Sequence, residues 1–119
     1  MPRPQLSGAD WEKLSVAERQ DFSAWTLQLL LADATQSLSA GTFDARPDRH
    51  LSRTQLQLDE RGWQELVAVK AEALRATQAV KEASAERLRE AGAEGFPALA
   101  SMSCFEAPRG RGGASRETA

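Results

Sequence analysis

The apolar residues between Val16 and Ser39 recur at the spacing of an α-helix. This stretch contains neither proline nor glycine, so no residue in it interrupts a helix. Leu27 and Leu31 widen the main apolar face, which predicts a helix buried on more than one side. The main face consists of positions at helical spacing, namely Phe22, Trp25, Leu29, Leu30, Ala34 and Leu38.

A second and longer helix is predicted from Glu60 to Ala91. This range has no proline and is rich in alanine, glutamate, lysine and arginine. At 1.5 Å per residue the helix would be about 48 Å long, whereas a compact domain of 119 residues is about 27 Å across. We therefore expect a partner outside the monomer to cover part of it. Lys70 and Arg87 interrupt its heptad pattern, which favours close packing through alanine over a regular coiled coil.

Local signals mark both ends of each predicted helix. Ser15 and Glu18 have the spacing of a capping box, and Gly41 is placed to end the first helix. Asp59 is a candidate N-cap for the longer helix, and Gly92 follows its last residue.

Two short strands are predicted outside the helices. Within residues 52–58, Thr54, Leu56 and Leu58 alternate with polar residues, as in a half-buried strand. Residues 98–105 are apolar enough to pair with this segment. The expected fold class is therefore mainly α, with two long helices and a short two-stranded antiparallel ribbon, in a dimeric helical bundle.

The length of 119 residues suits one domain. We expect residues 1–13 to form a loose lead-in, in which Asp10 can cap a short turn. Residues 14–106 are predicted to form a helical dimerisation and regulatory domain. Residues 107–119 are rich in glycine, arginine and serine, which predicts a disordered tail.

The composition argues against catalysis and metal binding. His50 is the only histidine and Cys104 the only cysteine, so neither a histidine-based nor a multi-cysteine site can be assembled. No nucleophile, base and orienting group recur together, so we expect no catalytic residues, no cofactor and no enzyme. A surface or hydrogen-bonded role is expected for His50, and a buried free thiol for Cys104.

The net charge of −2 provides no overall field that would attract nucleic acid or an anionic membrane. The longest apolar run is too short to cross a bilayer, and the start of the chain lacks the apolar stretch of a signal peptide. A cytoplasmic location is expected.

The aromatic residues leave one alternative open. Large rings placed between helices are most often core residues, but they also line pockets for apolar small molecules. The residues of such a pocket would be Trp11, Phe22, Trp25 and Trp63.

A series of short motifs runs in order through the chain, at Gly41–Thr54, Leu58–Leu66, Ala85–Leu88, Gly95–Pro97 and Phe105–Glu106. Together with the alanine-rich helix they carry a resemblance that covers roughly Leu14 to Pro108. They resemble the C-terminal half of actinobacterial winged-helix regulators of the ArsR-like class. The order of these motifs is more specific than any one of them.

The resemblance implies a domain that dimerises and senses an effector beside a DNA-binding winged helix-turn-helix. The residues before Leu14 are too few for a helix-turn-helix, so we expect no direct nucleic-acid binding by this chain. From the short apolar runs and the low net charge we also expect no membrane contact. The cysteine pair of arsenic and cadmium repressors is also missing. The chain is expected to be either a fragment of a longer regulator or a free-standing regulatory half.

The leading hypothesis is a homodimer, or a heterodimer with a full-length regulator. The alternatives are a module that binds an apolar ligand, and a dominant-negative partner that draws full-length regulators into heterodimers unable to bind DNA. The predicted packing face of the dimer comprises Trp25, Leu29, Trp63, Leu66, Val67 and Leu74.

Overall fold

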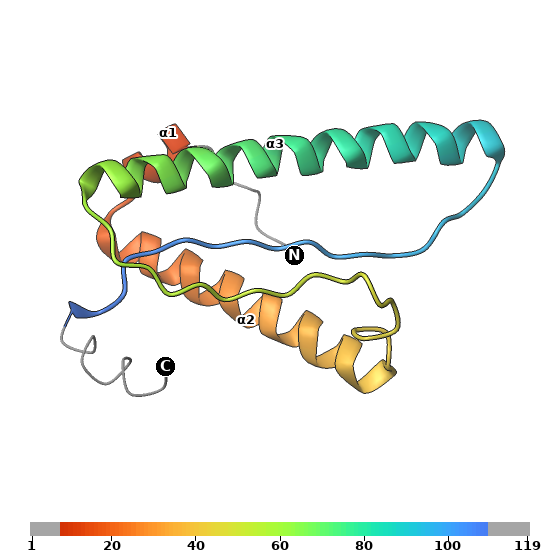
Figure 1. Ribbon diagram of the computed structural model, residues 1–119, viewed down its shortest axis with the longest axis horizontal. Helices are drawn as coiled ribbons and strands as arrows, with labels where there is room; N and C mark the ends of the chain where they lie inside the picture. The colour runs from red at the N-terminus through yellow and green to blue at the C-terminus, as the bar shows by residue number, and fades with distance from the viewer. Residues whose placement is uncertain (1–7, 110–119) are drawn as a thin grey trace. The chain divides into compact units, whose positions relative to one another are not determined.

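The computed structural model describes residues 8–109 and contains three helices (Figure 1). Helix α1 spans Gly8–Lys13, α2 spans Val16–Ala40 and α3 spans Glu60–Ala91. The chain divides into two units, Met1–Arg53 and Thr54–Ala119. Helices α1 and α2 belong to the first unit and α3 belongs to the second. The predicted tail lies outside the described residues from Gly110 onward, as do the first seven residues of the predicted lead-in.

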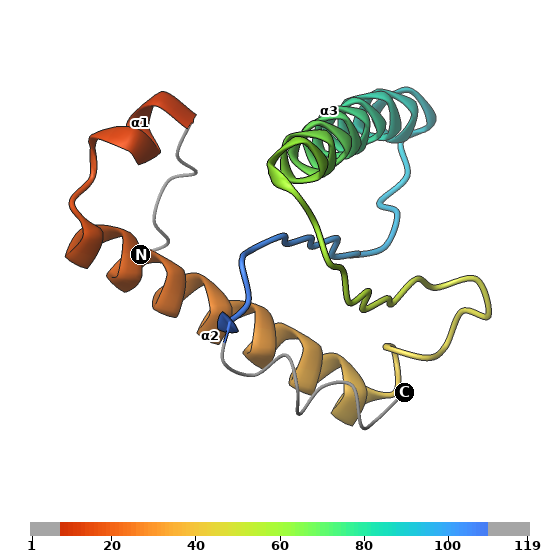
Figure 2. The ribbon, with the colours of Figure 1, turned by 60° about the vertical axis from the view of Figure 1, so that its left-hand side comes forward.

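Helix α1 contacts the start of α2 after a turn in the chain (Figure 2). The ring of Trp11 meets Phe22 edge to face, with the ring centroids 6.1 Å apart. The guanidinium of Arg19 lies 5.7 Å from the centroid of Trp11. Its Nε donates to the carbonyl of Trp11 at 3.1 Å, and its Nη2 donates to that of Glu12 at 3.2 Å. Arg19 therefore adds hydrogen bonds to two carbonyls at the end of α1, of which that of Trp11 also accepts from the Leu14 amide at 3.2 Å.

The predicted ends of α2 are confirmed to within one residue. The Glu18 amide donates to Ser15 Oγ at 3.1 Å, and the Ser15 amide donates to Glu18 Oε1 at 2.8 Å, which completes the capping box. At the other end Gly41 has a φ of 82°, in the left-handed region that favours glycine. Its N–H donates to the carbonyl of Leu38 at 3.2 Å, and the helix ends at Ala40.

Both predicted ends of α3 are confirmed. The Gly62 amide donates to Asp59 Oδ1 at 2.8 Å, which makes Asp59 the N-cap. Gly92 is left-handed with a φ of 64° and follows Ala91, the last residue of the helix. The ribbon of α3 is continuous over its whole length in both views (Figures 1 and 2).

The predicted two-stranded ribbon is wrong. Residues 52–58 and 98–105 are irregular, and no residue between 8 and 109 belongs to a strand. Leu56 and Leu58, which the alternation predicted to be half-buried, are exposed. Residues 98–105 include Ala98 and Ala100, a residue type that is depleted in strands, and an isolated pair of strands is marginal in water. The alternation of apolar and polar residues is therefore not sufficient for a strand, because a strand also needs a ladder of backbone hydrogen bonds to a second segment.

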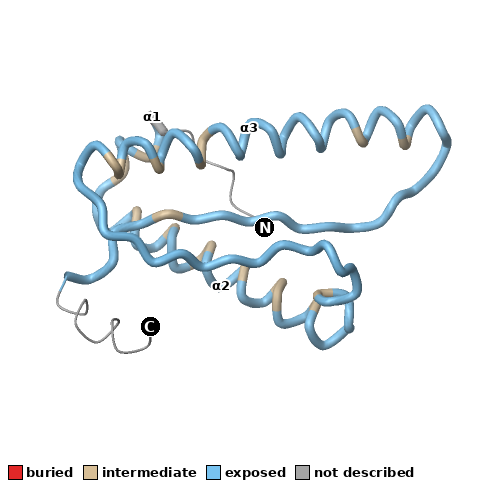
Figure 3. Tube along the Cα trace, in the orientation of Figure 1, coloured by how far each residue is buried: buried red, intermediate tan, exposed pale blue. Residues whose placement is uncertain are grey.

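The part of the chain for which burial is described, residues 10–109, contains no buried residue of any type (Figure 3). Large apolar side chains are exposed on α2, on α3 and in the segments outside the helices. The half-buried residues of α2 are Arg19, Phe22, Trp25, Thr26, Leu30, Asp33, Ala34 and Ser37. They recur at helical spacing, so α2 has one partly covered face but contributes no closed core.

Candidate interaction surface

Helix α2 carries a second apolar face beside its half-buried one. We call Leu27, Leu31 and Leu38 the leucine stripe. Their exposed fractions are 61%, 68% and 56%. They are separated by four and seven residues, which places them one above the other along the same side of the helix. Val16, 67% exposed, continues this side towards the start of α2.

The leucine stripe is free of charge. The four charged residues of α2 are Glu18, Arg19, Asp21 and Asp33. At 100° per residue, each of them lies about 90° or more around the helix from the centre of the stripe. Leu27, Leu31 and Leu38 thus form an apolar surface with no ionised group within it, which is the usual composition of the centre of a protein interface.

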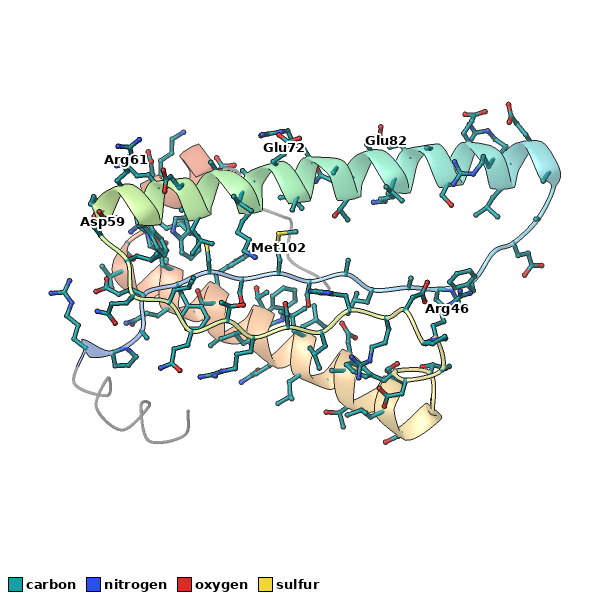
Figure 4. The ribbon with its side chains drawn as sticks, in the orientation of Figure 1. Arg46, Asp59, Arg61, Glu72, Glu82 and Met102 are labelled. Carbon is teal, nitrogen blue, oxygen red and sulfur yellow. The ribbon has the colours of Figure 1, made fainter. Side chains whose placement is uncertain are left out.

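One side of helix α3 is rich in charged residues, whereas the opposite side carries most of its large apolar residues together with Lys70 and Lys81. Arg61, Glu72 and Glu82 project from one side of the helix (Figure 4). Arg75 Nη2 pairs with Glu72 Oε1 at 2.6 Å, one turn along the helix. Such exposed pairs keep this side hydrated and add little stability. The remaining pairs of this helix are Arg61 with Glu65 and Arg89 with Glu86.

The predicted packing face of α3 lies on the side away from these charges. Trp63 and Leu66 are half-buried, whereas Val67 and Leu74 are 41% and 38% exposed. On α2, Trp25 is half-buried and Leu29, one turn further on, is exposed. These six residues thus lie in the two units, four on α3 and two on α2.

Three of the four residues of the predicted ligand pocket form one aromatic cluster. Trp11 contacts Phe22, and the ring of Phe22 lies 6.3 Å from that of Trp25 between centroids. Trp63 belongs to the other unit. The structure also has a hollow of about 290 Å³ away from this cluster, lined by Asp44, Arg46, Pro47 and Arg49. That hollow is bordered mainly by charged side chains, so it is a poor match for an apolar ligand.

The segment after α2 is held by polar contacts of its own. Arg49 donates from Nε and Nη2 to Asp44 Oδ1, at 3.0 and 2.7 Å, and its guanidinium lies 5.2 Å from the ring centroid of Phe43. His50 is exposed and its Nε2 lies 2.9 Å from Ser52 Oγ, as expected for a hydrogen-bonded surface residue. Cys104 is a free thiol, but it is half-buried where the sequence predicted a buried residue.

Within residues 8–109, no three His, Cys, Asp or Glu side chains are grouped so that they could hold a metal ion. Of the helices in this same range, none is long and apolar enough to cross a membrane.

One sequence signal points to the leucine stripe. Leu27 and Leu31 widen the predicted apolar face of α2, but neither belongs to the predicted packing face. Leu27, Leu31, Ala34 and Leu38 follow one another at intervals of four, three and four, which is the spacing of a coiled-coil seam. Scanning each helix for a second heptad pattern would have found the stripe.

Comparisons with protein-family models, with curated proteins and with solved structures give no match to this chain.

Proposed function

We propose that this chain is a protein-association module that forms a homodimer, and that it serves as the dimerisation and regulatory half of an ArsR-like transcriptional regulator. One observation supports the association most directly. Two long helices with complete caps expose large apolar side chains, and burial is complete for no residue between 10 and 109.

The physical reason is that most helical stability in proteins comes from packing an apolar face, and caps add only a small share. The residues of α2 and α3 leave much of that apolar area in contact with water. A small chain in this condition gains stability when a second chain covers the area. A partner that binds the helical faces therefore supplies the burial that residues 10–109 lack.

The regulatory part of the proposal comes from the resemblance carried by the motifs between Gly41 and Glu106. On this basis the chain acts by associating with a second copy of itself or with a full-length regulator, and it does not bind DNA directly. We propose that it acts in the cytoplasm, where such regulators work.

The association is tested by light scattering or sedimentation equilibrium at micromolar concentration. A homodimer is expected to give twice the monomer mass of 13.0 kDa. A monomer throughout this range would refute the proposal. Co-purification of the tagged chain with a full-length regulator of this class tests the regulatory part, and a tagged chain carrying charged substitutions on its apolar faces is the control.

The aromatic cluster of Trp11, Phe22 and Trp25 supports a second candidate, a module that binds an apolar small molecule. Binding of such a molecule beside Trp11 or Trp25 would quench tryptophan emission. Titration with a panel of apolar compounds tests this, with Trp11→Phe and Trp25→Phe variants assigning the signal. An unchanged emission across the panel would remove this candidate.

A further inference from the structure

We infer that the leucine stripe of α2 is the surface through which a second copy of this chain binds, with the two α2 helices antiparallel. The inference rests on the proposed association and goes further, because it names a face, a partner and a direction. It replaces none of the six residues of the predicted packing face, and it adds a surface which that prediction left out.

The contacts within the first unit leave the stripe open. Among the contacts of α1 with α2 are those of Phe22 and Arg19 with Trp11, and the segment after α2 contacts Ser37, whose hydroxyl lies 2.6 Å from Thr42 Oγ1. Arg19, Phe22 and Ser37 lie on the half-buried face of α2, whereas the three leucines of the stripe are exposed. Leu31 remains 68% exposed, although apolar burial is the main source of stability available to this unit.

The composition of α2 favours a second copy over other occupants. An acidic or basic partner would be selected by opposite charges around the stripe, but the only charged residue after Asp21 is Asp33, which lies on the half-buried face. A membrane surface would need lysine or arginine along the polar side of the helix, and Arg19 is the only such residue in α2. An uncharged face is compatible with itself, since pairing it with a copy brings no like charges together.

The spacing along the stripe favours an antiparallel pair. If the two-fold axis passes between Leu31 and Ala34, then Leu27 of one copy meets Leu38 of the other, and Leu31 meets Ala34. Each large side chain faces an apolar one. Ala34, which is half-buried at the border between the stripe and the partly covered face, is small enough to leave room for Leu31. A parallel pair would instead place Gln20, which is at the same helical position as Leu27 and Leu38, against its own copy inside the seam.

The residues that flank the seam agree with this direction. In the antiparallel pair Gln28 of one copy lies beside Thr35 of the other on one flank, where both side chains can form hydrogen bonds. On the other flank Leu30 lies beside Ser37, so neither flank carries a charge. The antiparallel arrangement also places the positive end of each helix dipole beside the negative end of the other.

The surface is tested by comparing Leu31→Glu with Leu51→Glu. The two leucines are equally exposed, at 68% and 67%, but Leu51 lies outside the helices. Sedimentation equilibrium is expected to show that Leu31→Glu raises the dimer Kd by about 100-fold or more, because each copy would bury an unpaired carboxylate. Leu51→Glu is expected to leave the Kd within about threefold of wild type, since its side chain stays in water.

The direction is tested with disulfides in a Cys104→Ser background. The double variant Leu27→Cys/Leu38→Cys is expected to form a covalent dimer on mild oxidation. These two positions are about 16 Å apart along one helix, so they cannot join within a chain. The single variant Leu38→Cys is expected to stay uncrosslinked, and a covalent dimer of this variant would mean a parallel pair and overturn the stated direction.

The remaining outcomes also decide whether the leucine stripe is the surface of the dimer. A monomeric wild-type chain refutes the proposed association and this inference together. A wild-type dimer that persists in Leu31→Glu keeps the association and overturns the stripe as its surface. If Leu31→Glu lowers the melting temperature but not the affinity, the stripe is covered by this chain's own residues and the inference is wrong. Should Leu31→Glu lose its helical circular dichroism, Leu27→Ala/Leu31→Ala decides instead, because alanine preserves the helix.

Discussion

Replacing Asp59 with alanine removes the side chain that caps α3. In the structure Asp59 Oδ1 accepts from the amide of Gly62 at 2.8 Å, while the backbone carbonyl of Asp59 accepts from the amide of Trp63 at 3.0 Å. The substitution removes the first hydrogen bond and keeps the second, because only the first involves the side chain. The effect is therefore expected at the first turn of the helix.

The expected loss has two parts. An N-cap changed to alanine costs about 1 kcal/mol. The negative charge of Asp59 beside the positive end of the helix dipole adds about 0.3–1 kcal/mol at low salt. Asp59→Asn is the matched control, since asparagine caps as well as aspartate but carries no charge. Asp59→Ala is thus expected to lower the free energy of unfolding by about 1.5 kcal/mol, and Asp59→Asn by about 0.5 kcal/mol.

Thermal or urea unfolding followed by far-UV circular dichroism measures the two losses. Amide hydrogen exchange then locates them, because Gly62 is expected to lose protection in Asp59→Ala while Trp63 keeps most of its own. Equal losses in both variants would mean that the hydrogen bond contributes nothing. A loss below about 0.3 kcal/mol in Asp59→Ala would refute the assignment of Asp59 as the group that starts α3.

Three further variants test the local energetics of the helices. Gly92→Ala is expected to destabilise α3 by about 1 kcal/mol, because alanine is strained at a φ of 64° even though its Cβ would meet no other atom within 4 Å. Urea unfolding measures this loss, and an unchanged midpoint would contradict the prediction. Trp11→Ala is expected to lower the free energy of unfolding by about 0.5–1.5 kcal/mol, because the edge contact with Phe22 is lost. Proteolysis at Lys13 reports whether α1 loosens. Equal cleavage of Trp11→Ala and wild type would show that this contact does not hold α1. Arg75→Ala is expected to change stability by no more than about 0.5 kcal/mol, because Arg75 and Glu72 are both largely exposed; a greater loss, insensitive to salt, would show that this pair is shielded from water.

The local signals in the sequence were sufficient to place the two long helices, whereas α1 at Gly8–Lys13 lies where a loose lead-in with a short turn was predicted. Asp59 and Gly92 bound α3 at the predicted residues, and the capping box of Ser15 with Glu18 starts α2 where it was expected. Caps act between residues only a few positions apart, so their effect can be inferred without knowing the rest of the fold. The end of α2 differed by one residue, which is within the usual uncertainty of a helix terminus.

The strand prediction failed for the opposite reason. The alternation of Leu56 and Leu58 with polar residues is compatible with a strand, but a strand exists only if another segment pairs with its backbone. That pairing depends on residues distant in sequence, and residues 52–58 remain irregular and exposed.

The interaction surface of α2 likewise depends on residues distant in sequence. The sequence by itself determined that α2 has more apolar positions than one face can hold, because periodicity is a local property. Only the tertiary structure decided that Phe22 and Leu30 lie on the half-buried face while Leu27, Leu31 and Leu38 stay in water, because burial is set by which other segments of the chain reach each side of the helix.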